Sequence, residues 1–355
     1  MYIEMTGARP RFADLLGVVY APNTSDLLKE YRGLAGACAQ LNSNAVADTP
    51  FTLHAKNDPD SPEIKSHPFL DVLNSPNPYM GAKLLWKTTQ LYLEMCGRAY
   101  WQIVPGVLNA VNQIYPLQSH LVSPIMGADN QIIAWQYSSK RLELNQVVQF
   151  FNTDPLNPYG SGKGPAELAW NEIVLMNCDT ALMTALMKNG GAPSHILSPK
   201  DAQGVISKSI VERMYAAWNT FRGKGANRLW IPEIPVELKS LAQTSKEFQG
   251  SERFDNLKSI ILACFGIPAA LFDSAGSRAE LDAALVQHAR LAIDPRTTLL
   301  EDVVNRRVTS LFGDNLFLFF EENLPEDTGA QEEGGLPTPP NPSTGTVANP
   351  EAKDE

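Results

Sequence analysis

The feature that most constrains the fold is a pair of helical patterns in the C-terminal half, separated by a break. In the first pattern, residues 244–265, large apolar side chains recur on one face of a helix. Pro268 follows, and proline lacks a backbone N–H and disfavours helical geometry at the residue before it. The second pattern, residues 280–312, predicts a rod of roughly 50 Å. Pro295 is expected to kink this rod near Asp294.

A small, polar segment, residues 268–279, lies between the two helices and lacks the turn chemistry of a tight hairpin. Periodicity alone is compatible with a long packing helix in a helical domain. It does not say what the polar segment contacts. The chain of 355 residues is long enough for two or three domains.

Composition argues against a membrane protein and against a disulfide-rich one. The most apolar window, residues 259–272, is interrupted by Gly266 and Pro268 and is shorter than the ~20 residues that a membrane span requires. No secretory signal is recognisable at the start of the chain. The four cysteines are widely spaced and are interpreted as thiols in a reducing cytoplasm, not as a metal or disulfide framework. We therefore expect no membrane partner.

Charge is unevenly distributed along the chain. The formal net charge is −10, and residues 321–355 hold nine acidic residues against one lysine, a net charge of −8. Residues 1–320 therefore carry a net charge of only −2. A nearly neutral body argues against a protein that grips DNA through a basic patch. Residues 323–355 are rich in Pro, Gly, Thr and Glu and are predicted to be a disordered acidic tail.

The first 150 residues predict an α+β domain. Small residues at helical spacing predict a tightly packed helix over 31–47, and an apolar stripe predicts a second helix over 80–96, which Gly97 ends. A short strand at 51–53 and a short helix at 67–74 lie between them. Further strands, mostly antiparallel because their connections are short, are predicted at 99–104, 113–117, 132–138 and 147–151.

A different pattern follows the loop at residues 152–164. Pro165 suits the first position of a helix, which is predicted over 165–189. Its later part is apolar on nearly all sides, so we expect it to be buried on several sides, either in a large core or among copies of itself. The next predicted elements are a helix opened by a capping box at 198–201 and strands at 195–197, 228–231, 236–241 and 316–320.

No catalytic or cofactor-binding constellation is recognisable, so we expect neither a cofactor nor an enzyme activity. The run Gly-Ser-Gly-Lys-Gly at 160–164 lacks the first glycine and the hydroxyl residue of a phosphate loop. The five histidines form no metal-binding pattern, and there is no nucleophile elbow. His288, on the apolar side of the second helix, is interpreted as a hydrogen-bonded packing residue. A structural or assembly role is therefore favoured.

Several short segments, in order along residues 32–312, carry a family pattern. They include Leu-Asn-Ser-Pro-Asn-Pro at 73–78, Leu-Tyr-Leu-Glu-Met-Cys-Gly-Arg-Ala-Tyr-Trp at 91–101, Tyr-Pro-Leu at 115–117, Pro-Tyr-Gly with Gly-Pro at 158–165, a Gly-Asn-rich turn at 221–228 and Phe-Gly-Ile-Pro-Ala-Ala-Leu at 265–271. Each is weak alone. Together they resemble the portal proteins of tailed double-stranded DNA bacteriophages, in particular the group whose capsids share the common phage coat fold.

The resemblance implies the α+β phage portal fold, with a wing, a two-helix stem, an inserted clip and a long kinked helix with a tunnel loop. The implied parts are the wing at 1–160, first stem helix at 165–189, clip at 192–240, second stem helix at 244–265, tunnel loop at 268–279, long kinked helix at 280–312, wing return strand at 316–322 and tail at 323–355.

The resemblance also implies a function without chemistry. Portals of this family are rings, usually of twelve subunits, at one capsid vertex, and they conduct DNA during packaging and ejection. The implied partners are further copies of the chain, double-stranded DNA, the terminase large subunit on the clip, a head–tail adaptor protein, and the major capsid and scaffold proteins. The implied location is the virion, and the bacterial host cytoplasm before assembly.

Two sets of site residues follow from the resemblance. The tunnel loop facing DNA is implied to comprise Phe272, Asp273, Ser274, Ala275, Gly276, Ser277 and Arg278. The stem contacts between subunits are implied to comprise Met176, Leu182, Met183, Leu186, Phe254 and Ile261.

The sequence departs from the family pattern at two places. The family's Asn-x-Glu after the tunnel loop is replaced by Ser-Arg-Ala-Glu at 277–280, so a role for that asparagine does not carry over. A short acidic tail also stands where the family often has further helices. Two alternatives stay open: another head–tail connector or minor capsid protein without a DNA channel, and an enzyme with its site in the α+β domain.

Overall fold

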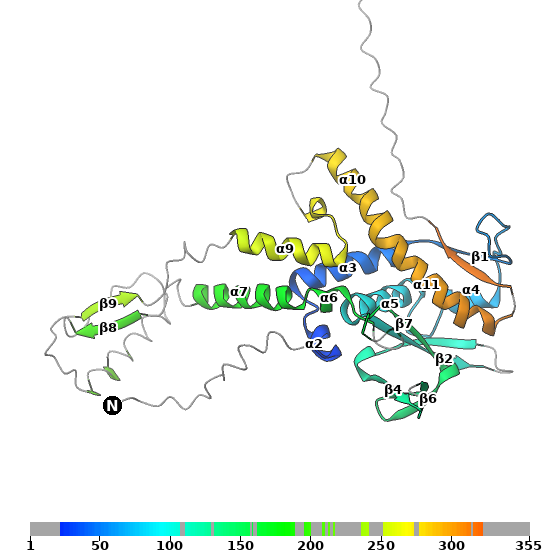
Figure 1. The fold of residues 1–355 in the computed structure, drawn as a ribbon, viewed down its shortest axis with the longest axis horizontal. Coiled ribbons are helices and arrows are strands. Elements are labelled where there is room, and N and C mark those ends of the chain that lie inside the picture. Colours follow the sequence, from blue (N-terminus) through cyan, green and yellow to red (C-terminus); the bar gives the residue numbers. More distant parts are fainter. Residues whose placement is uncertain are drawn as a thin grey trace, which may run out of the picture.

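A computed structural model shows a mixed α+β body from which two helices project side by side, α7 (Trp170–Lys188) and α9 (Ser251–Phe265) (Figure 1). The predicted α+β class is confirmed. The structure describes residues 22–106, 111–128, 131–156, 158, 162–188, 195–199, 208–209, 212–213, 216, 236–240, 251–272, 277–313 and 315–321.

Strand β2 (Arg98–Pro105) is the centre of the body's main antiparallel sheet, whose order is β3-β2-β7. Strand β3 spans Val111–Leu117 and strand β7 spans Val147–Phe151. Successive side chains of a strand point to opposite faces, so Tyr100 and Trp101 lie on opposite sides of the sheet. Trp101 belongs to the larger core cluster and Tyr100 to a smaller one. Burial on both faces explains the nearly continuous apolar sequence of β2.

Tyr100 faces a second antiparallel sheet, a meander of β4 (Val122–Met126), β5 (Ile132–Tyr137) and β6 (Lys140–Glu143). The rings of Tyr100 and Trp135 meet edge-on, with centroids 5.2 Å apart. The sequence pattern predicts only β5, because β4 contains a proline and β6 is short and basic at its start. Two 3-10 turns connect these strands to the main sheet, η3 (Ser119–Leu121) and η4 (Leu144–Gln146).

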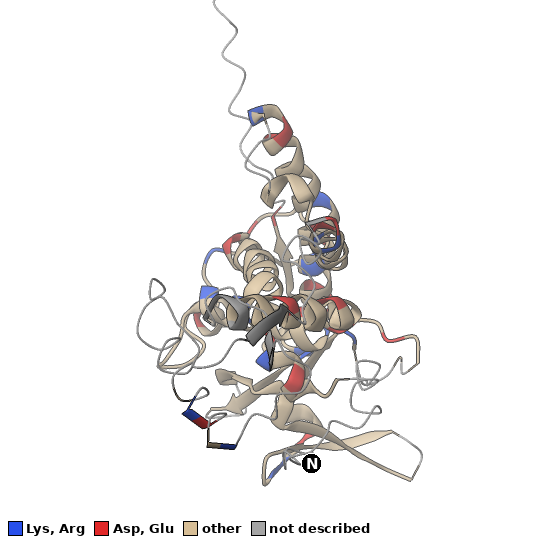
Figure 2. Cartoon of the chain, turned by 90° about the vertical axis from the view of Figure 1, so that its left-hand side faces the viewer, with Lys and Arg blue, Asp and Glu red and all other residues tan. Residues whose placement is uncertain are grey.

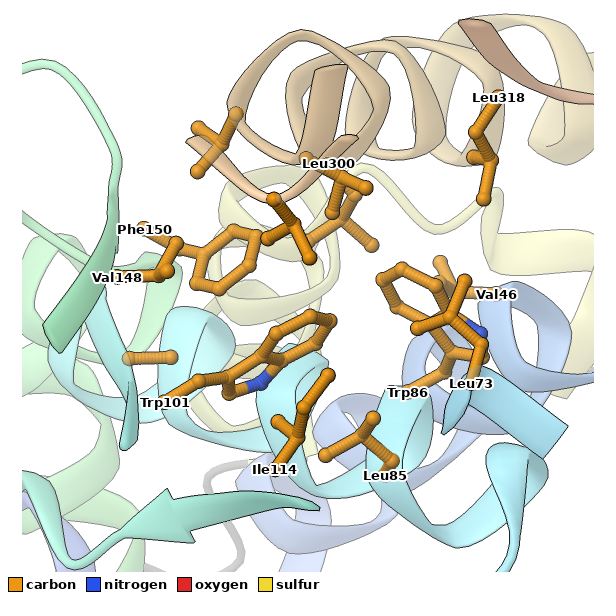
Figure 3. Close-up of a cluster of buried hydrophobic side chains, with 14 of the residues drawn as sticks. Val46, Leu73, Leu85, Trp86, Trp101, Ile114, Val148, Phe150, Leu300 and Leu318 are labelled. Carbon is orange, nitrogen blue, oxygen red and sulfur yellow. The ribbon is translucent and has the colours of Figure 1, made fainter. Parts of the chain in front are cut away.

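The larger core lies between the main sheet and the helices α3 (Gly33–Asp48), α5 (Ala82–Cys96) and α11 (Asp294–Arg307). Figure 3 shows side chains from these elements converging on Trp86 and Trp101. Their ring centroids lie 5.2 Å apart. Gly97 ends α5 with φ +69°, the left-handed conformation predicted for it. The described N-terminal half also contains two short helices, α2 (Thr24–Lys29) and α4 (Pro68–Asn74).

The end of the described chain returns to the body as a strand. β10 (Phe317–Phe320) pairs antiparallel with β1 (Phe51–His54), close to the predicted positions of both strands. On the other edge of β10, backbone hydrogen-bonding groups are paired with a side chain of α11. There Asn305 donates from Nδ2 to the Leu318 carbonyl at 2.9 Å and accepts from the Leu318 N–H at 2.7 Å. A side chain thus takes the place of a further strand.

The long second helix is interrupted, as Pro295 predicts. It consists of α10 (Arg278–His288), a π-helical turn η6 (Ala289–Ile293), α11 and a final 3-10 turn η7 (Thr309–Leu311). Pro295 lies in the first turn of α11, where its missing N–H removes one helical hydrogen bond. The wider π-helical turn comes directly before it, so the irregularity is spread over residues 289–293 and is not confined to the predicted kink near Asp294.

Two predicted elements need correction. The helix predicted over 165–189 is broken at Ala169 into α6 (Pro165–Leu168) and α7. Ser198 lies inside strand β8 (His195–Pro199), so it does not cap a helix. β8 pairs with β9 (Val236–Ser240). The start of the helix predicted from 244, the strand at 228–231 and the tail at 323–355 lie outside the described residues.

Candidate functional site

The projecting helices α7 and α9 expose apolar side chains beyond the part that packs on the body. Near the body, Met176 and Ile261 are 6% and 0% exposed and belong to one core cluster. Further out, Leu182, Met183 and Phe254 are 40%, 38% and 44% exposed. Near these exposed residues, Arg253 Nη2 lies 3.5 Å from Asp179 Oδ2 and links the two helices.

This gradient of burial revises the list of expected subunit contacts. Met176 and Ile261 contact their own chain, so they are assigned to the core and not to an interface between subunits. Leu182, Met183 and Phe254 are available for a contact. The side chain of Leu186 lies outside the described part of the structure.

The structure shows the predicted break directly after α9, at Gly266 and Ile267. Gly266 has φ +72°, a conformation that other residues rarely adopt, and a Cβ atom there would lie 3.3 Å from the Ala292 Cβ. The Ile267 N–H donates back to the Leu262 carbonyl at 2.9 Å. The predicted loop then begins as a 3-10 turn, η5 (Ala269–Phe272).

The expected tunnel loop is only partly described. Phe272 is half-buried at the end of η5, and residues 273–276 lie outside the described part. Ser277 is the N-cap of α10: its N–H donates to the Glu280 carboxylate at 2.8 Å, and its hydroxyl accepts from the Glu280 N–H at 3.3 Å. Arg278 is the first residue of the helix, with its side chain 83% exposed. Ser277 and Arg278 therefore belong to α10 and its cap, not to a loop; the Ser-x-x-Glu spacing was the signal.

A buried polar cluster lies where α9 ends. Glu94 on α5 accepts from Arg296 on α11 twice, Nε to Oε1 at 2.6 Å and Nη2 to Oε2 at 3.2 Å. Asn42 on α3 donates to Glu94 Oε2 at 3.1 Å, and Gln90 donates to Oε1 at 2.5 Å. The side chain of Glu94 is 1% exposed and that of Arg296 is 19% exposed. We call Asn42, Gln90, Glu94, His288 and Arg296 the junction cluster.

The junction cluster holds the end of α9. The carbonyl of Phe265, the last residue of α9, accepts from Asn42 Nδ2 at 2.9 Å and from Arg296 Nη2 at 3.0 Å. The last carbonyls of a helix have no partner within it and carry partial negative charge, so a guanidinium there is favourable. Two helices of the body, α3 and α11, thus meet the same atom of α9.

His288 completes the cluster from α10. Its Nε2 lies 2.8 Å from Asn42 Oδ1, and the Asn42 amide nitrogen already donates to two acceptors, so Nε2 carries the hydrogen. Burial, and secondarily the charge of Arg296, lowers the pKa of His288 to about 4. The imidazole is therefore neutral at neutral pH. Its interpretation as a hydrogen-bonded packing residue is confirmed.

A pocket of about 300 Å³ lies beside the junction cluster. It is bordered by Glu94 and Arg296, by Asn152 in the loop after β7, and by Pro165 at the start of α6. Water can therefore approach the Arg296 side of the ion pair. No local pattern predicts this cluster, although Glu94 between Leu93 and Met95 in a largely buried helix was a usable signal.

The described residues include neither a candidate metal site nor a candidate membrane-spanning helix. The described residues contain no group of three or more His, Cys, Asp or Glu side chains placed to hold a metal ion. None of the described helices is long and apolar enough to cross a bilayer. Burial raises the pKa of Cys38 and of Cys96 to about 12, so neither is a reactive thiolate. The charge of Glu94 adds to the rise at Cys38, whereas at Cys96 the nearby Arg98 guanidinium opposes it.

The glycine run near residue 162 has a packing role. A Cβ atom on Gly162 would overlap the carbonyl oxygen of Gly97, and one on Gly164 would overlap backbone atoms of α5. The segment that leads into α6 therefore crosses the end of α5 at a distance that only glycine permits.

The charged residues do not separate into an acidic and a basic region on the side toward which α7 and α9 project. Seen from that side, acidic and basic residues are interspersed (Figure 2).

Comparison with known proteins identifies the class. The family model described as phage portal protein matches residues 35–333, so the chain belongs to the phage portal protein family. An uncharacterised protein of Rickettsia bellii (strain RML369-C) is 24% identical to it over 299 residues, which cover 80% of this chain and 74% of that protein.

The fold is also that of solved portal and neck structures. A portal protein of an HK97-family phage from Corynebacterium diphtheriae matches with a TM-score of 0.62 at 14% identity, covering 85% of this chain and 96% of that one. A chain in the neck of an empty gene transfer agent particle, solved with C6 symmetry, matches with a TM-score of 0.64 at 20% identity over 85% of both chains. A native neck solved with C12 symmetry matches with a TM-score of 0.59 at 20% identity, covering 89% of this chain and 84% of that one.

Proposed function

We propose that the chain assembles into a ring of twelve copies at one vertex of a capsid, and that double-stranded DNA passes through this ring during packaging and ejection. The observation that carries the proposal is the match of residues 35–333 to the portal family. The likeness to chains in particle necks solved with sixfold and twelvefold symmetry supports a ring. In this proposal the protein is in the host cytoplasm before assembly and in the virion afterwards.

The projecting helices supply the contact between neighbouring copies. Leu182, Met183 and Phe254 expose large apolar surface on α7 and α9, the two helices that project from the body (Figure 1). Exposed apolar groups gathered on projecting elements are stabilised when another surface removes them from water. The next subunit of the ring is the proposed partner for this surface.

Residues 272–278 face the DNA in this proposal. Arg278 is highly exposed, 4.0 Å from the Asp282 carboxylate, so its charge is partly balanced on its own helix. Interspersed charges suit a conduit, because each cation held on a phosphate adds affinity that must be broken whenever DNA advances. A strongly basic lining would slow the passage.

The remaining partners are assigned by region. The terminase large subunit, which would supply the energy for packaging, docks on the clip, residues 192–240. A head–tail adaptor protein binds the assembled ring, and the major capsid and scaffold proteins surround its wing, residues 1–160. No cofactor is needed for any of these roles.

Deleting residues 273–276 tests the conduit directly, because it spares Ser277 and the α10 cap. The matched control deletes four residues of the tail, 343–346. We expect the first variant to form rings and to package or retain less DNA than the control. Packaging by the 273–276 deletion at the level of the control would refute the contact with DNA, and a ring that never holds DNA would favour a connector without a channel.

A further inference from the structure

We propose that the junction cluster is a positioning unit: it fixes both ends of residues 266–288 to α3 and α5, and so sets where the proposed DNA-facing segment lies. We call residues 266–288, which leave the body after α9 and return to it at the end of α10, the excursion. The inference rests on the proposed function, because residues 272–278 are part of the excursion. It assigns a role to Asn42 and Glu94, which lie in the body and far from the projecting helices in sequence.

The entry to the excursion is held at a single atom. Phe265 is the last residue before the break, and its carbonyl oxygen accepts hydrogen bonds from both Asn42 and Arg296. Arg296 also donates from Nη1 to the Ala292 carbonyl at 2.6 Å. One guanidinium therefore binds the end of α9, the π-helical turn and Glu94 together.

The exit from the excursion is held by the same amide. His288, the last residue of α10, bonds through Nε2 to Asn42 Oδ1. Asn42 thus joins the end of α9 with its nitrogen and the end of α10 with its oxygen. Between these two points α10 is largely exposed, including Leu281 at 43% and Leu285 at 38%. The two anchored ends therefore carry most of the constraint on its direction.

The two-point contact between Arg296 and Glu94 distinguishes a positioning role from a contribution to stability alone. A guanidinium and a carboxylate joined at two points fix both distance and angle, whereas apolar contacts of similar volume do not. Replacing a buried ion pair by apolar residues often leaves stability unchanged or raised. The double variant Glu94→Leu/Arg296→Met is therefore expected to fold, and to lose the directional restraint on residues 266–288.

Amide hydrogen exchange on rings of the full chain without DNA tests the proposal. We expect the double variant to raise exchange rates at least tenfold in residues 266–288 and less than twofold in β2 and β7. Arg296→Lys keeps the charge but not the two-point geometry, so its increase should be intermediate and confined to the same residues. Arg306→Met is the matched control, because Arg306 pairs with Asp302 on the exposed side of the same helix.

Two results would overturn the positioning role. One is exchange in residues 266–288 that stays within twofold of the control in both Arg296 variants. The other is an equal increase in β2, which would indicate general destabilisation. Because no DNA is present, either result is independent of whether residues 272–278 touch DNA, and the deletion of 273–276 tests that separately.

Discussion

Arg296 and Glu94 form a two-point hydrogen-bonded ion pair, with N–O distances of 2.6 and 3.2 Å, across 202 positions of sequence. The carboxylate is almost fully buried, and Asn42 and Gln90 donate to the same two oxygens. A buried charge is tolerated when hydrogen-bonding partners replace the water that it has lost. The pair therefore ties the C-terminal helix α11 to the helix α5 that lines the main core.

Removing one partner of this pair should be costly. Arg296→Met leaves the Glu94 carboxylate buried without its cation, and we expect a loss of about 3–5 kcal/mol in the free energy of unfolding. Urea unfolding of the variant measures it. Arg306→Met, which breaks an exposed pair on the same helix, should cost under about 1 kcal/mol. Equal losses in the two variants would contradict the energetic role of the buried pair.

His288 should make stability depend on pH. Its pKa is about 4 in the folded chain against 6.5 when unfolded, so the unfolded state binds the proton more readily between these values. Stability from the neutral imidazole is fully present above pH 6.5 and is lost as pH falls toward 4, by on the order of 3 kcal/mol.

His288→Gln keeps a donor near the position of Nε2 and cannot titrate. Its unfolding free energy should therefore vary less with pH between 6.5 and 4 than that of the parent chain. A profile for His288→Gln as steep as the parent profile would show that other groups cause the dependence.

Asn305→Ala should release the edge of β10. It leaves the N–H and the carbonyl of the buried Leu318 without the two bonds that Asn305 makes, at a cost of about 1–3 kcal/mol. Faster amide exchange at Leu318 and a lower urea midpoint are expected. Asn256→Ala, at an exposed position of α9, is the control and should change neither; identical behaviour of the two variants would count against the strand-like role of Asn305.

Two methionines on α7 should respond in opposite ways to the same change. Met183 is 38% exposed, so Met183→Asp should leave the subunit folded and weaken the ring. Met176 is 6% exposed in the core, so Met176→Asp should unfold the subunit. Native mass measurement reports the ring, and circular dichroism reports the fold. Intact rings of Met183→Asp would argue against α7 as a subunit contact.

Sequence patterns within a short segment predicted the helices and helix ends that depend mainly on the residues of that segment. The apolar stripe before Gly97 predicted α5 and its left-handed end, and Pro268 and Pro295 predicted the two interruptions near the C-terminus. The break at Ala169 and the strands β4 and β6 left no clear periodicity. They depend on packing between elements, which a single stretch of sequence does not record.

The candidate site could be predicted only in part, because most of it depends on contacts between distant segments. Exposure of Leu182, Met183 and Phe254 depends on where α7 and α9 leave the body, and a helical stripe could not separate them from buried Met176 and Ile261. The junction cluster joins residues from four helices, and no segment contains more than two of its members. The cluster forms because the fold brings these four helices together, and a single stretch of sequence does not record that contact.

The central claim is a ring with an open channel, and electron microscopy of the purified full-length chain tests it most directly. The account predicts rings with a central pore and twelvefold symmetry, with α7 and α9 of neighbouring copies side by side. Single subunits at high concentration, or a closed assembly without a pore, would contradict it.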